Sequence, residues 1–160
     1  MKTTSKPANI TLTVVKFVDV LSSEAPAGAR NTECEMTVEA NHPQVTGNGT
    51  TKGKSASVTV KGGSATLCFQ IKSRSRKHQY YPLGIAFRRR TTRGQPVSEA
   101  EILGRKDFSF GSVHLFGRSL YITDHFKDCG PRCRYKFSVI IQRQHDGAIG
   151  IIDPGIENDP

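Results

Sequence analysis

The amino-acid sequence predicts an all-β fold, a single antiparallel β-sandwich of about eight strands that spans residues 1–160. Three observations favour this fold. Apolar residues recur at every second position in short runs, turn-forming residues separate the runs, and only residues 97–106 resemble a helix. Short strands at regular spacing are typical of a sandwich or a barrel. A chain of 160 residues can bury a core without disulfides.

The predicted strands follow one another along the chain. Each shows the alternation that puts one side of a strand on a core and the other in water. In chain order, strand-like runs occupy residues 10–20, 33–39, 58–60, 65–71, 81–87, 120–123 and 135–142, and the isoleucine-rich segment after residue 148 is expected to contribute a last strand. The expected core residues include Leu67, Phe69, Leu83, Ile85, Phe87, Phe137, Val139 and Ile141.

The segments between the runs contain turn residues. Residues 42–49 predict a long loop, and the glycine pair within residues 61–64 predicts a tight hairpin. The dipeptide Asp146-Gly147 predicts a second hairpin with a type I′ turn, because that turn needs positive φ angles at its centre.

The composition excludes two broad classes of protein. Hydrophobic residues make up 36% and charged residues 23% of the chain, unlike a disordered or a membrane protein. No run approaches the ~18 consecutive apolar residues of a membrane-spanning helix. Polar residues interrupt the apolar run at residues 10–20, unlike a signal peptide, so we expect a cytoplasmic protein with no membrane partner.

The four cysteines are expected to be reduced thiols in that compartment. Cys34 and Cys68 lie in strand-like runs and are expected to be packed. Cys129 and Cys133 are separated by three residues, but a tetrahedral zinc site needs further ligands nearby. The five histidines are scattered. We therefore expect no metal and no cofactor.

Two basic clusters, residues 72–78 and 88–93, contribute to a net charge of +9. Such clusters with tyrosines nearby can bind phosphates and stack bases. They also protect strand edges from aggregation. The first interpretation predicts weak, salt-sensitive binding of polyanions. Its candidate residues are Arg74, Arg76, Arg88, Arg89 and Arg90.

The C-terminal segment contains the dipeptide Asp-Pro twice, as Asp153-Pro154 and Asp159-Pro160. Asp-Pro is the most labile ordinary peptide link. Because proline has no N–H, the succinimide route is closed. The aspartate carboxyl can instead attack its own backbone carbonyl carbon and form a cyclic anhydride, with the proline nitrogen as the leaving group. Water or a lysine amine then opens the anhydride.

The ending Ile152-Asp153-Pro154-Gly155-Ile156-Glu157-Asn158-Asp159-Pro160 resembles the signature of the small bacterial DP-EP family. That family is named for an Asp-Pro and a Glu-Pro near the C-terminus, whereas the second dipeptide here is Asp159-Pro160. The resemblance covers about the last twelve residues. It implies a compact β-sandwich and draws attention to the Asp153–Pro154 bond.

The sequence therefore predicts aspartic-type self-cleavage between Asp153 and Pro154, with Asp153 as the nucleophile or the carboxyl that activates water. A second acid must protonate the leaving nitrogen, and the candidates are His145, Glu157 and Asp159. Lys136 is the candidate for a cross-link. The alternative function is a non-catalytic module that binds anions or nucleic acid, and a structural role of Asp-Pro at a strand edge also remains open.

Overall fold

The computed structural model describes residues 6–22, 31–50, 56–89, 108–114, 117–125, 133–153 and 155–159. The helix-like residues 97–106 of the sequence prediction lie outside these ranges. Within them all regular structure is β-strand, which confirms the all-β prediction. No helix in the described part of the chain is long and apolar enough to cross a membrane.

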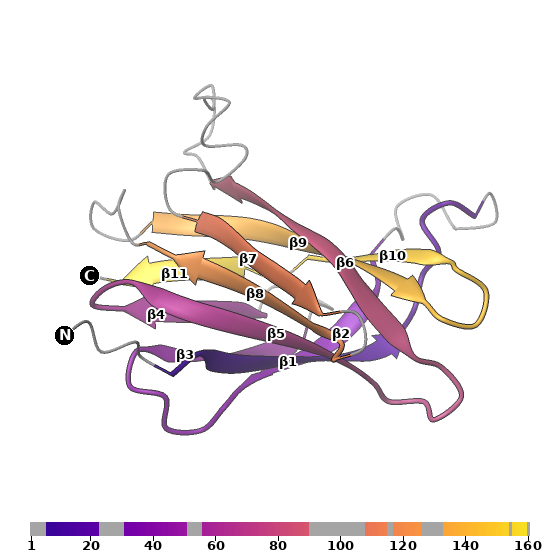
Figure 1. Ribbon diagram of the computed structural model, residues 1–160, viewed down its shortest axis with the longest axis horizontal. Coiled ribbons are helices and arrows are strands. Elements are labelled where there is room, and N and C mark those ends of the chain that lie inside the picture. The colour runs from indigo at the N-terminus through magenta and orange to yellow at the C-terminus, as the bar shows by residue number, and fades with distance from the viewer. Residues whose placement is uncertain are drawn as a thin grey trace.

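The described residues contain eleven strands rather than about eight (Figure 1). They are β1 (Ala8–Lys16), β2 (Glu33–Val38), β3 (Val45–Thr50), β4 (Ser57–Lys61), β5 (Ala65–Ser73), β6 (Tyr80–Arg89), β7 (Phe108–His114), β8 (Ser119–Asp124), β9 (Cys133–Arg143), β10 (Ile149–Ile152) and β11 (Gly155–Asp159).

The prediction of a long loop at residues 42–49 is wrong, because most of this segment forms β3. Gly47 has a φ of 144°, and a Cβ there would lie 2.2 Å from the carbonyl oxygen of Ser57 on the neighbouring strand. The glycine that looked like a turn signal therefore permits close approach of two strands.

The strands follow the order β10-β9-β11-β4-β3-β2-β1-β5-β8-β7, and β6 pairs with β9. The prediction of a purely antiparallel arrangement is wrong, since β1 pairs with β5 and β4 pairs with β11 in parallel. Nor do residues 61–64 form a hairpin, because β4 pairs with β3 and β11 whereas β5 pairs with β1 and β8. Alternation of apolar residues reports which face is buried, not which strand lies alongside.

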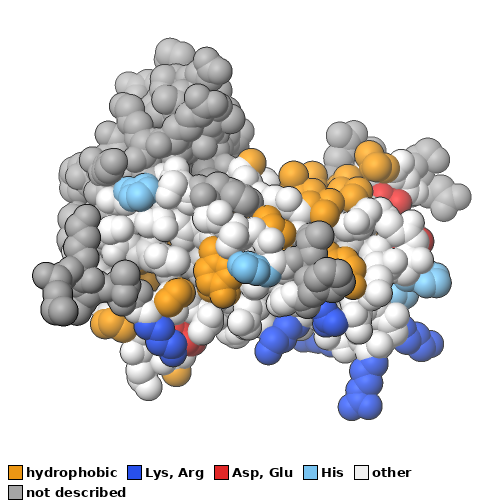
Figure 2. All heavy atoms as spheres, in the orientation of Figure 1, with side chains coloured by type: hydrophobic (Ala, Val, Ile, Leu, Met, Phe, Trp, Pro, Cys, Tyr) orange, Lys and Arg blue, Asp and Glu red, His pale blue; other side chains and the backbone are white. Residues whose placement is uncertain are grey.

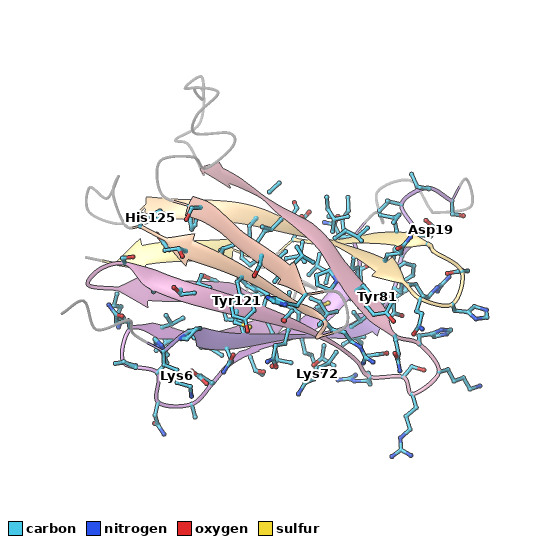
Figure 3. The ribbon with its side chains drawn as sticks, viewed as in Figure 1. Lys6, Asp19, Lys72, Tyr81, Tyr121 and His125 are labelled. Carbon is cyan, nitrogen blue, oxygen red and sulfur yellow. The ribbon has the colours of Figure 1, made fainter. Side chains whose placement is uncertain are left out.

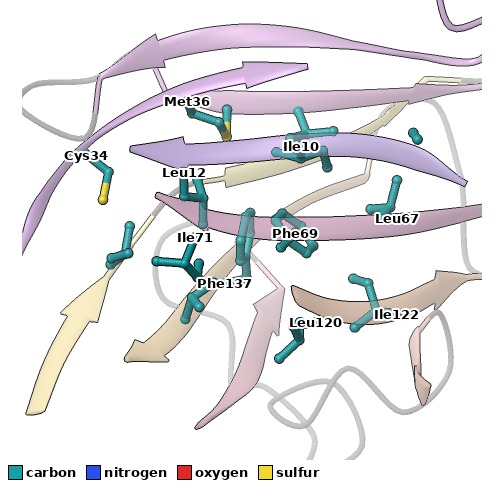
Figure 4. Packing of buried hydrophobic residues seen from close by; sticks show 14 of the residues in the cluster. Ile10, Leu12, Cys34, Met36, Leu67, Phe69, Ile71, Leu120, Ile122 and Phe137 are labelled. Atoms are coloured by element: carbon teal, nitrogen blue, oxygen red, sulfur yellow. The ribbon is translucent and has the colours of Figure 1, made fainter. Parts of the chain in front are cut away.

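The strands curl over so that two groups of them face each other in a sandwich-like arrangement (Figure 1). Phe69 on β5 and Phe137 on β9 meet in the core, with ring centroids 5.1 Å apart. Ile10, Leu12 and Leu67 are completely buried in the same cluster (Figure 4). Most of the expected core residues whose side chains are described are thus confirmed.

Leu83 is the exception, since 41% of its surface is exposed. The register between β6 and β9 shifts between Pro82 and Gly84, so Leu83 is the extra residue of a β-bulge. A bulge turns a side chain that simple alternation would bury toward solvent. Ile85 is partly buried against the core, and the side chain of Phe87 lies outside the described part of the structure.

The predicted hairpin at Asp146-Gly147 joins β9 to β10. Its turn is not type I′, because Gly147 has a φ of 73° but Asp146 has no positive φ. The N–H of Arg143 donates to the carbonyl of Ala148 at 2.8 Å, which leaves residues 144–147 as a four-residue loop. The Arg143 guanidinium also bonds both carboxylate oxygens of Asp146, at 2.9 and 2.6 Å.

Candidate functional site

Asp153 and Pro154 lie between β10 and β11, which run along the same side of β9. Ile152 on β10 pairs with Val139, and Gly155 on β11 pairs with Lys136. Between these two pairs lie residues 153–154 on one strand and residues 137–138 on β9. Because the numbers are equal, the register of β10 with β9 continues into that of β11 with β9. β10 and β11 therefore act as one strand along β9, with the Asp153–Pro154 bond in its middle.

This register places Ser138 directly across from Asp153. The Ser138 hydroxyl donates a hydrogen bond to Oδ1 of Asp153 at 2.5 Å. The Asp153 side chain is exposed to solvent, whereas its neighbour Ile152 is completely buried. The carboxylate is thus held against β9 by a short hydrogen bond and remains accessible to water. The sequence analysis missed Ser138.

The strand around the Asp-Pro bond is held on its other side too. The carbonyl of Ile149 accepts from the N–H of Val20 at 2.9 Å, and the carbonyl of Ile151 accepts from the N–H of Thr32 at 2.8 Å. Gly150 lies between them, where a Cβ would lie 2.7 Å from a ring carbon of Phe17 and 2.7 Å from Oγ1 of Thr32. Beyond the bond, β11 pairs with β4.

Lys136 is the one predicted partner whose backbone lies near Asp153. It pairs with Gly155 and precedes Ser138 by two residues, which puts it diagonal to Asp153. Diagonal neighbours in an antiparallel pair lie about 7–8 Å apart, within reach of a lysine side chain in general. The side chain of Lys136 itself lies outside the described part of the structure.

The three predicted proton donors do not gather at the Asp153–Pro154 bond. His145 lies in the β9–β10 turn, where its ring is 6.1 Å from that of His78, and all of β10 separates it from Asp153. At ~3.3 Å per residue, the Cα atoms of Glu157 and Asp159 are about 13 and 20 Å from that of Asp153. Local sequence proximity fails as a guide here because the segment is extended.

The basic residues of the first cluster lie at the end of β5, where Lys72 is labelled in Figure 3, and on the connection from β5 to β6. Lys72, Arg76 and Lys77 are exposed, and Lys and Arg side chains gather at the lower right of the face in Figure 2. Arg74 forms an ion pair with Glu35. Arg118, from the turn before β8, donates to Oε1 of Gln79 at 2.7 Å.

The second basic cluster does not join the first. Arg88 and Arg89 end β6, nine residues from Tyr80 at its start, so about 30 Å of strand separates the clusters. Their side chains and all of Arg90 lie outside the described part of the structure. The predicted anion-binding arginines therefore do not form a single surface: Arg76 belongs to one end of β6, and Arg88 and Arg89 belong to the other.

Two serine–histidine pairs lie on β7 and after β8. Nε2 of His125 lies 2.7 Å from the hydroxyl of Ser109, and Nε2 of His114 lies 3.0 Å from the hydroxyl of Ser112. No described carboxylate hydrogen-bonds to either imidazole, so the described residues do not complete a Ser-His-Asp arrangement.

The cysteines on β2 and β5 are packed as predicted. Cys34 and Cys68 are buried thiols, and burial raises the pKa of Cys34 to about 12 and also raises that of Cys68. Cys129 and the side chain of Cys133 lie outside the described residues. Among the residues that are described, no group of three or more histidine, cysteine and acidic side chains could hold a metal ion.

Comparison of the chain with models of known protein families and with curated proteins finds no match in either set.

Proposed function

We propose that this protein is a β-sandwich-like protein of the DP-EP type that cleaves its own chain between Asp153 and Pro154. The observation that carries the proposal is the hydrogen bond from Ser138 to Oδ1 of Asp153 across a continuous strand register. It restricts the carboxylate to one region beside its own backbone. Such restriction raises the effective concentration of an attacking group.

The reaction consumes one water molecule. A carboxylate oxygen of Asp153 attacks the backbone carbonyl carbon of Asp153, and a C–O bond forms as the C–N bond to Pro154 breaks. The proline nitrogen takes a proton from water, because the backbones of His145, Glu157 and Asp159 all lie away from this bond. Water then opens the anhydride, which leaves two carboxyl groups on Asp153 and a secondary amine on Pro154.

Lys136 offers a second outcome. Its neutral amine attacks the anhydride, an amide bond forms, the other carboxylate leaves, and the nitrogen loses a proton. The piece ending at Asp153 is then cross-linked and lighter by the mass of one water than the hydrolysed piece. The diagonal register of Lys136 and Asp153 supports this branch.

Denaturing mass analysis of freshly purified, never-acidified protein, kept for days at neutral pH and ambient temperature, tests the proposal. We expect pieces that end at Asp153 and begin at Pro154. The Asp159–Pro160 bond of the same molecule is the internal control and should break more slowly. A chain that stays full length, or equal breakage at both bonds, would contradict the proposal.

Variants test the mechanism. Asp153→Asn should stop cleavage, since an amide is a poor nucleophile for this attack, and Ser138→Ala should slow it several-fold. Ser109→Ala is the matched control, because it removes a strand hydroxyl that bonds His125 instead. Undiminished cleavage in Asp153→Asn would rule out the anhydride route.

A second candidate function, polyanion binding, is favoured by the exposed cations Lys72, at the end of β5, and Arg76 and Lys77, on the connection to β6. No described acidic side chain pairs with these three, whereas Glu35 neutralises Arg74. Arg76→Ala with Lys77→Ala should weaken binding to single-stranded DNA and reduce the salt slope by about one to two. Lys16→Ala, also exposed, is the control. If Lys16→Ala weakens DNA binding as much as each of the other two substitutions does, binding depends only on net charge and this surface is not a specific site.

A further inference from the structure

The last strand, β11, lies between two other strands and pairs with both of them. Gly155–Asp159 pairs in parallel with Ser57–Lys61 of β4, and Gly155–Asn158 pairs antiparallel with Cys133–Lys136 of β9. Figure 1 shows β11 between these two strands, near the end marked C. Its backbone thus bonds to neighbours on both sides, and it is linked to β10 through Asp153, whose side chain is exposed, and Pro154.

The two walls of the β11 position are supported without β11. β4 pairs on its far side with β3, from Val45 to Asn48, and β9 pairs on its far side with β6 over most of its length. β10 continues to hold β9 beyond the site. If β11 leaves, a slot one strand wide remains, with a row of unpaired backbone N–H and C=O groups on each wall. Such rows bind an extended chain readily.

We infer that the slot between β4 and β9 is a peptide-binding site, and that it accepts residues 154–160 of a second copy of this chain in place of the protein's own β11. The incoming segment makes the same parallel and antiparallel backbone bonds as β11. Cleavage at Asp153–Pro154 frees the protein's own β11 to leave the slot. The inference rests on the proposed function for this way of emptying the slot, but not for the binding itself.

The slot favours this sequence over an unrelated strand. In the parallel register Ile156 lies beside Val58 and Asn158 lies beside Val60, and both valines are completely buried. Because paired positions in a sheet are close neighbours, residues 156 and 158 of an incoming strand must fit against packed β4. A copy of the same segment meets this requirement, and main-chain hydrogen bonds supply the affinity.

Labelled peptide exchange tests the inference, whether or not cleavage occurs at neutral pH. The full-length protein is cut at its Asp-Pro bonds in dilute acid and returned to neutral pH. A fluorescent peptide with the sequence of residues 154–160 is then added. We expect anisotropy to rise with one peptide bound per protein. A peptide with Asn158→Pro is the control and should bind at least about tenfold more weakly, because proline removes a ladder donor.

No binding of the wild-type peptide to refolded, cut protein would overturn the inference, as would equal binding of the proline peptide. If the cut protein does not regain its β spectrum, hydrogen exchange in intact Asp153→Asn protein decides. Amides of residues 155–159 should exchange by local opening, sooner than those of β1 and β5. If these amides exchange their hydrogens only when the whole protein unfolds, β11 does not leave its slot and the inference is refuted. Intact mass analysis of wild-type protein kept at neutral pH separately shows whether self-cleavage, and thus the proposed function, fails.

Discussion

The contact between Phe69 and Phe137 offers a direct test of the sandwich-like packing. β5 and β9 share no backbone pairing, so this contact joins the two facing groups of strands through side chains alone. Only 0% and 1% of the two residues' surfaces are exposed. We predict that replacing the two rings will show an energetic coupling that independent sites lack.

The size of the effect follows from burial and ring geometry. Truncating a buried Phe to Ala costs about 3–5 kcal/mol. Phe69→Leu and Phe137→Leu remove less volume, and each should lower the free energy of unfolding by about 1–2 kcal/mol. Ring centroids 5.1 Å apart at an interplanar angle of 51° are in the range where aromatic pairs contribute about 0.5–1.5 kcal/mol beyond their burial. The double variant should therefore cost less than the sum of the single ones by that amount.

Urea unfolding of the wild-type protein, the two single variants and the double variant measures this coupling, provided that the m-value stays constant. Leu21→Ala is the control partner for Phe69→Leu, because Leu21 is 79% exposed and its substitution should be additive. Additivity of the two Phe substitutions within about 0.3 kcal/mol would refute the packing of β5 against β9 through these rings.

Three further predictions follow from the described contacts. The Cys34 thiol, whose pKa burial raises to about 12, should resist alkylation at pH 8 until the protein unfolds; labelling of native protein at the rate of a free thiol would contradict this. The hydrogen bonds from Arg143 lower the pKa of Asp146, so the stability that this carboxylate contributes is complete above its unfolded pKa of ~3.9 and is lost as pH falls. NMR titration of Arg143→Ala should return the Asp146 pKa toward ~3.9, and an unchanged pKa would contradict the cause. Gly150→Ala should cost about 1–3 kcal/mol in urea unfolding, whereas Gly84→Ala, where a Cβ meets nothing within 4 Å, should be nearly neutral; equal effects would contradict the close packing at Gly150.

The positions of many strands, and the face that each one buries, can be predicted from the local sequence. Alternation identified the strands around Leu67, Phe69 and Val139 and the faces that they bury, because a half-buried strand must repeat every two residues. It failed at Leu83, where a bulge inserts one residue, and at Gly47, where glycine serves close strand approach rather than a turn. Neither feature changes the composition of its segment enough to be seen in the sequence.

The partners of each strand are a tertiary property. Parallel pairing of β1 with β5 and of β4 with β11 joins segments far apart in the chain, and period-two patterns are the same for either strand direction. The sequence order of the runs was enough to expect the two basic clusters at opposite ends of a strand, but not to reveal that β6 pairs with β9 instead of β5. Partner choice depends on how the whole core closes.

The candidate site combines features that the local sequence predicts with one that depends on the tertiary structure. Three features could be recognised without the fold: the labile Asp153–Pro154 bond, the packed strand around it and the hairpin before it. A two-residue turn at Asp146-Gly147 would pair Asp153 with Ile140, whereas the observed four-residue loop places it across from Ser138. A shift of two residues leaves every side chain on the same face, so the hydrophobic pattern is identical in both registers. Which hydroxyl meets the carboxylate therefore depends on the turn geometry and on the packing against β9, and neither can be read from the hydrophobic pattern.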